Sequence, residues 1–232
     1  MNVPIVSALL LVLALGVGAA DNELTEQEKA QGWILMFDGK STQGWKSGDK
    51  PMPAKQVQDG ALNVAKQGAY VSHFDRKFSD FHFKCDYKFD KGCNSGIFLR
   101  ISKPGDGGIG RGFEVQVFDS YGKKKQPDVH DCGALYELKA PTKNVVKAPG
   151  EWNHCEVRCE GSKVKVWLNG EEIIDADFAD WTEPNKNPDG SKHKFKWAFK
   201  DAPREGYIGF SDHGHNCWYK NVKVLPLGEQ KK

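Results

Sequence analysis

The chain has 232 residues, 28% of them charged, and a formal net charge of +2. This length suits one domain, or two small ones, with enough chain to bury a substantial core. Acidic and basic residues are interleaved, so the chain lacks the concentrated Lys and Arg that binding to nucleic acid requires.

The first residues have the pattern of a secretory signal peptide. An apolar stretch, residues 5–17, is followed by small residues at 18–20, and charged residues begin at Asp21. We expect residues 1–20 to be removed by cleavage after Ala20, with the mature protein in the periplasm or secreted. An uncleaved anchor is the alternative, although the apolar stretch is short for a membrane span. Beyond this segment the sequence predicts no contact with a membrane.

A short helix is predicted at the start of the mature chain. Thr25 and Glu28 have the spacing of a capping box, and Gly32 is the residue type that ends a helix. Residues 21–32 therefore form this helix and its lead-in.

Strand signals dominate the rest of the sequence. Residues 81–89 alternate strictly between apolar and polar side chains, as in a strand with one buried face. Residues 153–174 indicate three strands joined by two tight turns, the second at Asn169-Gly170, which is a strong hairpin signal. Residues 206–227 indicate two closing strands.

Short strands, frequent Gly and Pro turns and one brief helix predict an all-β fold, a two-sheet antiparallel jelly-roll sandwich. We expect one such domain over residues 33–227, followed by a tail at 228–232. Residues 183–194 are polar and rich in turn formers, so they are predicted to form a long surface loop.

All six cysteines lie in the mature chain, and an even number of cysteines in an exported protein indicates disulfides. They are Cys85, Cys93, Cys132, Cys155, Cys159 and Cys217. The sequence does not choose among the pairings, but Cys155 and Cys159 are about 13 Å apart at strand rise, beyond the reach of a disulfide. A zinc site and buried free thiols are the alternatives.

Two strands joined by a glycine-rich loop suggest a functional face. Residues 94–101 place Asn94, Phe98 and Arg100 on one side, and residues 113–118 place Glu114 and Gln116 on one side. Pairing of these strands in one sheet would set Arg100 beside Glu114 or Gln116. Sugar sites combine such polar groups with aromatic faces. A solvated cross-strand ion pair is the alternative interpretation.

Histidines add a second set of candidates. His213 is attractive as an acid or base because imidazole titrates near neutral pH. A divalent metal held by Asp212, His213 and His215 is conceivable, but a third well-spaced ligand is not evident, so we predict no metal site and no cofactor. Tyr136 is a possible hydrogen-bond donor to a sugar. His73, His154 and His193 have no obvious partners, and we expect them at the surface.

Several stretches, in this order, resemble the 3-keto-disaccharide hydrolase domain family of exported bacterial proteins. They are EQEKAQGWILMFDGKSTQGW, NSGIFLR, GFEVQVFDS, GALYE, EWNHCEVRCEGSKVKVWLNGE and GYIGFSDHGHNCWYKNVKV. The resemblance covers residues 24–227 and implies a concanavalin A-like sandwich that acts on a carbohydrate. It implies cleavage of the glycosidic bond of a 3-keto-glycoside or 3-keto-disaccharide, by proton abstraction at carbon 2, elimination and hydration.

The resemblance also implies residue roles. Glu114 is expected to be the base or a sugar-orienting carboxylate, and Arg100 to steady the ketone or enolate oxygen. Asp119 and His213 are candidate acid/base groups, although strand parity turns Asp119 to the opposite side from Glu114. Phe98 is expected to contribute an aromatic face. Asn94, Gln116 and Tyr136 are expected to hold hydroxyls.

Two cysteines stand where the family's motifs carry other residues. A bridge between Cys93 and Cys132 would brace the rim of the proposed groove. A non-catalytic carbohydrate-binding module of the same fold is the main alternative to an enzyme, and a structural domain of the cell envelope is the third reading, since fold alone does not decide function.

Overall fold

The computed structural model describes residues 20–104 and 109–228. The predicted signal peptide therefore lies outside the described residues except for Ala20, and so does most of the tail. Within the described ranges, no helix is long and apolar enough to cross a membrane.

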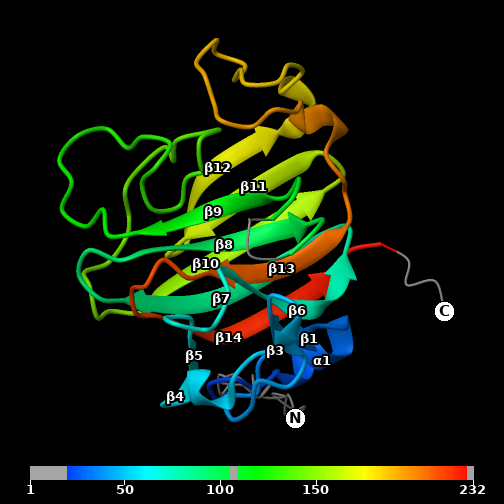
Figure 1. Ribbon diagram of the computed structural model, residues 1–232, viewed down its shortest axis with the longest axis vertical. Coiled ribbons are helices and arrows are strands. Elements are labelled where there is room, and N and C mark those ends of the chain that lie inside the picture. Colours follow the sequence, from blue (N-terminus) through cyan, green and yellow to red (C-terminus); the bar gives the residue numbers. More distant parts are fainter. Residues whose placement is uncertain (1–19, 105–108, 229–232) are drawn as a thin grey trace, which may run out of the picture.

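Two antiparallel sheets pack face to face and form the sandwich that the sequence predicts (Figure 1). The eight-stranded sheet has the order β12-β11-β10-β7-β14-β5-β4, with β1 paired to β14. Its strands are β1 Ile34–Leu35, β4 Val57–Gln58, β5 Ala61–Asn63, β7 Phe81–Phe89, β10 Asn153–Glu160, β11 Lys163–Leu168, β12 Glu171–Asp177 and β14 Cys217–Pro226.

The six-stranded sheet has the order β3-β2-β6-β13-β8-β9. Its strands are β2 Trp45–Ser47, β3 Lys50–Pro51, β6 Val71–Phe78, β8 Asn94–Ile101, β9 Phe113–Phe118 and β13 Gly206–Ser211. The helices are short: α1 Glu26–Gln31 and the 3-10 turns η1 Ala54–Gln56, η2 Phe178–Asp180 and η3 Phe199–Asp201.

Local sequence signals decide several of these elements. Thr25 caps α1 by accepting from the Glu28 N–H at 3.0 Å, while the Glu28 carboxylate accepts from the Thr25 N–H at 2.9 Å, which confirms the capping box. Gly32 ends the helix in the left-handed conformation. Asn169 and Gly170 both have positive φ, as the tight turn between β11 and β12 requires.

The core lies between the sheets. The predicted alternation of residues 81–89 is confirmed, because β7 buries every second side chain and leaves the others half-exposed. From the six-stranded sheet, Ile97, Leu99, Val115 and Val117 enter the same core. Of the intervening residues of β8 and β9, Phe98, Glu114 and Gln116 therefore face away from the eight-stranded sheet.

The six cysteines are all buried and all free thiols, so the predicted disulfides, including a Cys93–Cys132 bridge, are absent from the structure. Cys132 instead lies 3.1 Å from the Tyr87 hydroxyl, and burial raises the pKa of its thiol to about 11. Of the alternatives, buried free thiols fit the structure. Strand parity directs Cys85, Cys155, Cys159 and Cys217 into the core, and Cys93 and Cys132 join the same core from loops.

Two of the histidines expected at the surface are buried, so that prediction is wrong for them. His73 of β6 is covered by Tyr207, with ring centroids 4.8 Å apart. His193 lies beneath its own loop against Phe199. His154 is partly exposed but has a partner, since its Nδ1 lies 2.6 Å from Asp86 Oδ1.

Candidate functional site

The pairing of β8 with β9, predicted from the loop between them, is confirmed by the register. Phe98 lies opposite Glu114, and Gly96 lies opposite Gln116. These side chains belong to the outer face of the six-stranded sheet. Sequence alternation alone thus brings an acid, an amide and an aromatic ring together there.

A pocket of about 480 Å³ opens on this face, a volume within the range of small-molecule sites. Side chains from four parts of the chain line it: Tyr70, Phe98, Ile109, Gly110, Glu114, Lys194, Phe195, Lys196 and Trp197. Among the described residues that line this pocket, Glu114 is the only carboxylate.

The Glu114 carboxyl is held in a dry position. Desolvation raises its pKa to about 8, although the nearby positive charge of Lys194 acts in the opposite direction. A group with this pKa is populated in both protonation states near neutral pH, which is what a general base needs. The physical cause is burial against the sheet and its aromatic neighbours.

Gly96 makes this position of Glu114 sterically available. A Cβ on Gly96 would lie 2.0 Å from Glu114 Oε1, far inside van der Waals contact. The Gln116 amide, in the orientation that satisfies both of its ends, donates to Glu114 Oε1 at 3.2 Å and to Ser95 O at 3.0 Å. The Asn94 side chain lies beside that of Gln116, so the two residues extend the polar strip beside the pocket.

Tyr70 and His213 form a hydrogen-bonded pair at one side of the pocket. The Tyr70 hydroxyl lies 3.3 Å from His213 Nε2, and the two rings meet edge to face. Desolvation raises the pKa of Tyr70, and the charge of Glu114 adds to this effect. Desolvation lowers the pKa of His213, and His215 contributes in the same direction. At neutral pH the pair is therefore a protonated phenol beside a neutral imidazole.

Lys194 and Tyr136 lie together near Glu114. Lys194 Nζ sits 4.2 Å from the centroid of the Tyr136 ring, a cation–π contact. The Tyr136 backbone N–H donates to Glu114 O at 3.0 Å, which fixes this segment against β9. Tyr136 is thus close to the pocket, as predicted, and Lys194 supplies a positive charge there.

Arg100 is not on this face, so the prediction that it lies beside Glu114 is wrong. Its backbone is left-handed, with φ 52°, and β8 carries one extra residue here relative to β13, a β-bulge. The guanidinium is buried and donates to Ser79 O, to Gly161 O at 2.7 Å and to Asp80 Oδ1 at 3.0 Å. Arg100 ties β8 to the turns beside β7 and β10.

Asp119 also stays outside the pocket. β9 ends at Phe118, and the Asp119 carboxylate accepts the Gly92 N–H at 2.8 Å, bracing the loop between β7 and β8. The opposite parity noted from the sequence therefore holds, and the chain does not bend enough to bring Asp119 to Glu114.

Sequence reasoning missed Tyr70 and the segment from Lys194 to Trp197. The loop at 183–194 does more than cover the surface, because its end carries Lys194 into the pocket. The alternating basic and aromatic residues of KFKWAF, 194–199, were the available signal. No cluster of three or more His, Cys, Asp or Glu side chains suited to a metal ion occurs within the described ranges.

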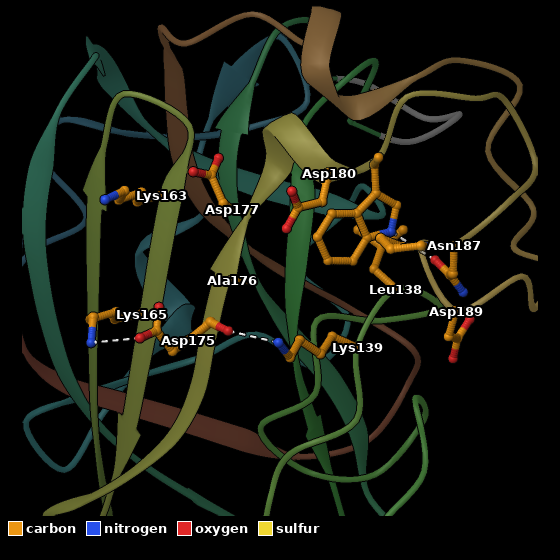
Figure 2. Close-up of a pocket in the computed structure, with 12 residues that line it drawn as sticks. Leu138, Lys139, Lys163, Lys165, Asp175, Ala176, Asp177, Asp180, Asn187 and Asp189 are labelled. Atoms are coloured by element: carbon orange, nitrogen blue, oxygen red, sulfur yellow. Dashed lines mark hydrogen bonds and ion pairs between the residues drawn. The ribbon is translucent and has the colours of Figure 1, made fainter.

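A second pocket, also of about 480 Å³, lies at the edge strand β12 (Figure 2). Two of its lysines are engaged: Lys165 pairs with Asp175 at 2.9 Å, and Lys139 Nζ donates to the backbone oxygen of Asp175 at 2.7 Å. The Trp181 indole donates to Asn187 Oδ1 at 2.8 Å. Glu114, with its raised pKa, lines the other pocket, which we therefore take as the candidate site.

Comparison with known proteins places this geometry in context. Residues 32–225 match the family described as the 3-keto-alpha-glucoside-1,2-lyase-like domain. A protein of Bacteroides thetaiotaomicron named 3-keto-disaccharide hydrolase is 28% identical over 233 residues, covering 85% of this chain and 79% of the relative.

Solved structures give the same picture. Two crystal structures of candidate glycosyl hydrolases from Parabacteroides distasonis are each 28% identical to this chain, with TM-scores of 0.70 and 0.72. They cover 84% and 90% of this chain, and the matches span 99% and 100% of those proteins. The sandwich and its size are thus shared with these relatives.

Proposed function

Because the chain belongs to the 3-keto-alpha-glucoside-1,2-lyase-like domain family, we propose that it cleaves the glycosidic bond of 3-keto-glycosides by elimination across carbons 1 and 2, followed by hydration. A ketone at carbon 3 acidifies the hydrogen on carbon 2. One base is enough to remove that hydrogen, and the two-carboxylate arrangement of ordinary glycosidases is not needed.

Glu114 is the base in this proposal. Its carboxylate takes the proton from carbon 2, and the electron pair moves onto the ketone oxygen as an enolate. The pKa of about 8 makes Glu114 a stronger base than an exposed carboxylate. The Gln116 amide, 3.2 Å from Oε1, orients the carboxyl group.

Lys194 takes the role that the sequence suggested for Arg100. Its ammonium lines the same pocket as Glu114 and has no carboxylate ion-pair partner within the described part of the chain. A positive charge placed where an enolate oxygen develops stabilises the transition state more than the ground state. The cation–π contact with the Tyr136 ring helps to position the Lys194 ammonium.

Tyr70 and His213 protonate the leaving group in this proposal. The enolate collapses, the bond from carbon 1 to the glycosidic oxygen breaks, and that oxygen takes the Tyr70 proton. His213 Nε2, 3.3 Å from the phenol oxygen, relays a replacement proton. Water then adds across the carbon 1–carbon 2 double bond and gives the free 3-keto sugar.

The observation that carries the proposal is the half-buried Glu114, with its raised pKa, beside a cation and an acid pair in one pocket. The test is incubation of the purified protein with a 3-keto-glucoside and with the unoxidised glucoside, with products identified by mass spectrometry. We expect cleavage of the keto substrate alone, and its loss in Glu114→Gln.

Other results of this experiment would indicate other functions. Glucan binding without cleavage of any 3-keto-glycoside would favour a carbohydrate-binding module. If a chelator abolished activity and a divalent metal restored it, the mechanism would require a metal ion that the proposed steps do not include. Cleavage of the unoxidised glucoside at an equal rate would refute elimination.

We propose in addition that the protein acts in the periplasm or outside the cell. The support is the apolar segment at residues 5–17 followed by small residues. N-terminal sequencing of protein from the extracytoplasmic fraction should begin at Asp21, and recovery of full-length chain from the cytoplasm would contradict this.

A further inference from the structure

Two chemically different groups of residues line the pocket, and we call them its polar half and its apolar half. Glu114 and Lys194, with Gln116 and Tyr136 alongside, form a polar half suited to an oxidised sugar ring. The other lining residues are mainly apolar: Tyr70, Phe98, Ile109, Phe195 and Trp197, together with Gly110 and Lys196.

The apolar half is built from packed rings. Tyr70 and Phe98 have ring centroids 5.9 Å apart, and Phe195 and Trp197 have centroids 5.2 Å apart. Tyr70 and Ile109 also pack against a small buried cluster that includes Phe98 and is separate from the main core. The rings therefore have support beneath them and do not depend on a ligand for their arrangement.

Free hydrogen-bonding groups are scarce in this half. The Tyr70 hydroxyl is engaged with His213. The Trp197 indole nitrogen is buried and has no hydrogen-bond partner among the described residues, so the side chain exposes only carbon to the pocket. Lys196 adds a single flexible ammonium. A sugar in the leaving-group position carries several hydroxyls, and these would lose water without gaining fixed partners.

We infer that the half of the pocket beside Tyr70 binds an apolar, flat or cyclic aglycone, so that glycosides of hydrophobic alcohols or phenols are preferred to disaccharides. The inference rests on the proposed function, which places the leaving group beside the Tyr70–His213 pair. Apolar rings gain free energy from burial against aromatic walls and need no hydrogen-bond partners.

The experiment compares two substrates across variants. 3-Keto-glucosides of cyclohexylmethanol and of glucose are assayed for kcat/KM with wild type, Trp197→Ala and Phe195→Ala. For each substrate, kcat/KM of the variant is divided by kcat/KM of the wild type. The same bond breaks in both proteins, so the acidity of the leaving group cancels in this ratio. Trp167→Ala is the matched control, since Trp167 lies in β11 on the outer face of the other sheet.

We expect Trp197→Ala and Phe195→Ala to lower kcat/KM for the cyclohexylmethyl substrate by roughly tenfold or more, and for the disaccharide by less than about threefold. Trp167→Ala should change neither. An equal fold-loss of kcat/KM for both substrates would overturn the inference while leaving the proposed function intact.

A binding measurement separates the two proposals. Glu114→Gln is titrated with unoxidised 2-naphthyl glucoside, and binding is followed by tryptophan fluorescence with and without Trp197→Ala. Binding that depends on Trp197 supports the aglycone site even if no 3-keto-glycoside is cleaved, in which case only the proposed function fails. Absence of Trp197-dependent binding counts against the aglycone site.

Discussion

Replacing Gly96 by alanine should move the group on which the proposed chemistry depends. The new Cβ would lie 2.0 Å from Glu114 Oε1. A carbon–oxygen contact needs about 3.3 Å, so the carboxyl must shift by about 1.3 Å. The shift carries it away from the sheet and toward water.

Two measurable changes follow from this shift. Misplacement of a catalytic group by about 1 Å costs on the order of 100-fold in rate. Hydration of the carboxyl removes the main cause of its raised pKa, so the acid limb of the kcat/KM profile should move from about 8 toward the ordinary value of 4.5. The acid limb moves to lower pH, because Glu114 acts as a base only when its carboxyl group is ionised.

The assay is kcat/KM against pH from 5 to 9 for a 3-keto-glucoside, with thermal unfolding as a check on folding. Gly150→Ala is the control, since Gly150 has positive φ and open space around it and is absent from the pocket lining. That variant should lose stability and keep the acid limb at about 8. A folded Gly96→Ala enzyme with an unchanged acid limb would refute the account of how Glu114 is held.

Three further predictions concern other groups. Tyr70→Phe should lower kcat by roughly 100-fold with an alkyl leaving group and much less with p-nitrophenolate, which needs no acid; equal losses would argue against Tyr70 as the acid. Arg100→Met should leave KM unchanged but destabilise the fold by about 3 kcal/mol in urea titration, because Asp80 and two carbonyls lose a buried partner; a change in KM without destabilisation would contradict its structural role. Glu114→Gln should become more stable relative to wild type as pH rises from 4.5 to 8, by at most about 1.4 kcal/mol per pH unit, since the folded state holds a proton that the unfolded chain has released; a constant difference would mean that Glu114 titrates normally.

The sequence predicted those features that depend on neighbours along the chain. The alternation of β7, the capping box at Thr25 and the turn at Asn169-Gly170 are local signals, and each is confirmed. The pairing of β8 with β9 was also predicted correctly, and parity put Glu114 and Phe98 on the same face.

The errors arose where distant segments decide the geometry. A β-bulge in β8 turns the Arg100 side chain away from the outer face. The bulge packs closely against Gly206 of β13: a Cβ on Gly206 would lie 2.3 Å from the Arg100 carbonyl carbon, so only glycine fits at position 206. Nothing in the residues around Arg100 signals this contact. Lys194 reaches Glu114 through a loop that composition marked only as polar.

Whether Glu114 removes the proton from carbon 2 is tested most directly by isotope exchange. A 3-keto-glucoside is incubated with the enzyme in D₂O near pH 8, and deuterium at carbon 2 of the product and of recovered substrate is read by NMR and mass spectrometry. Our account predicts deuterium at carbon 2 with the wild-type enzyme and none with Glu114→Gln. Cleavage by the wild-type enzyme with only hydrogen at carbon 2 would contradict it.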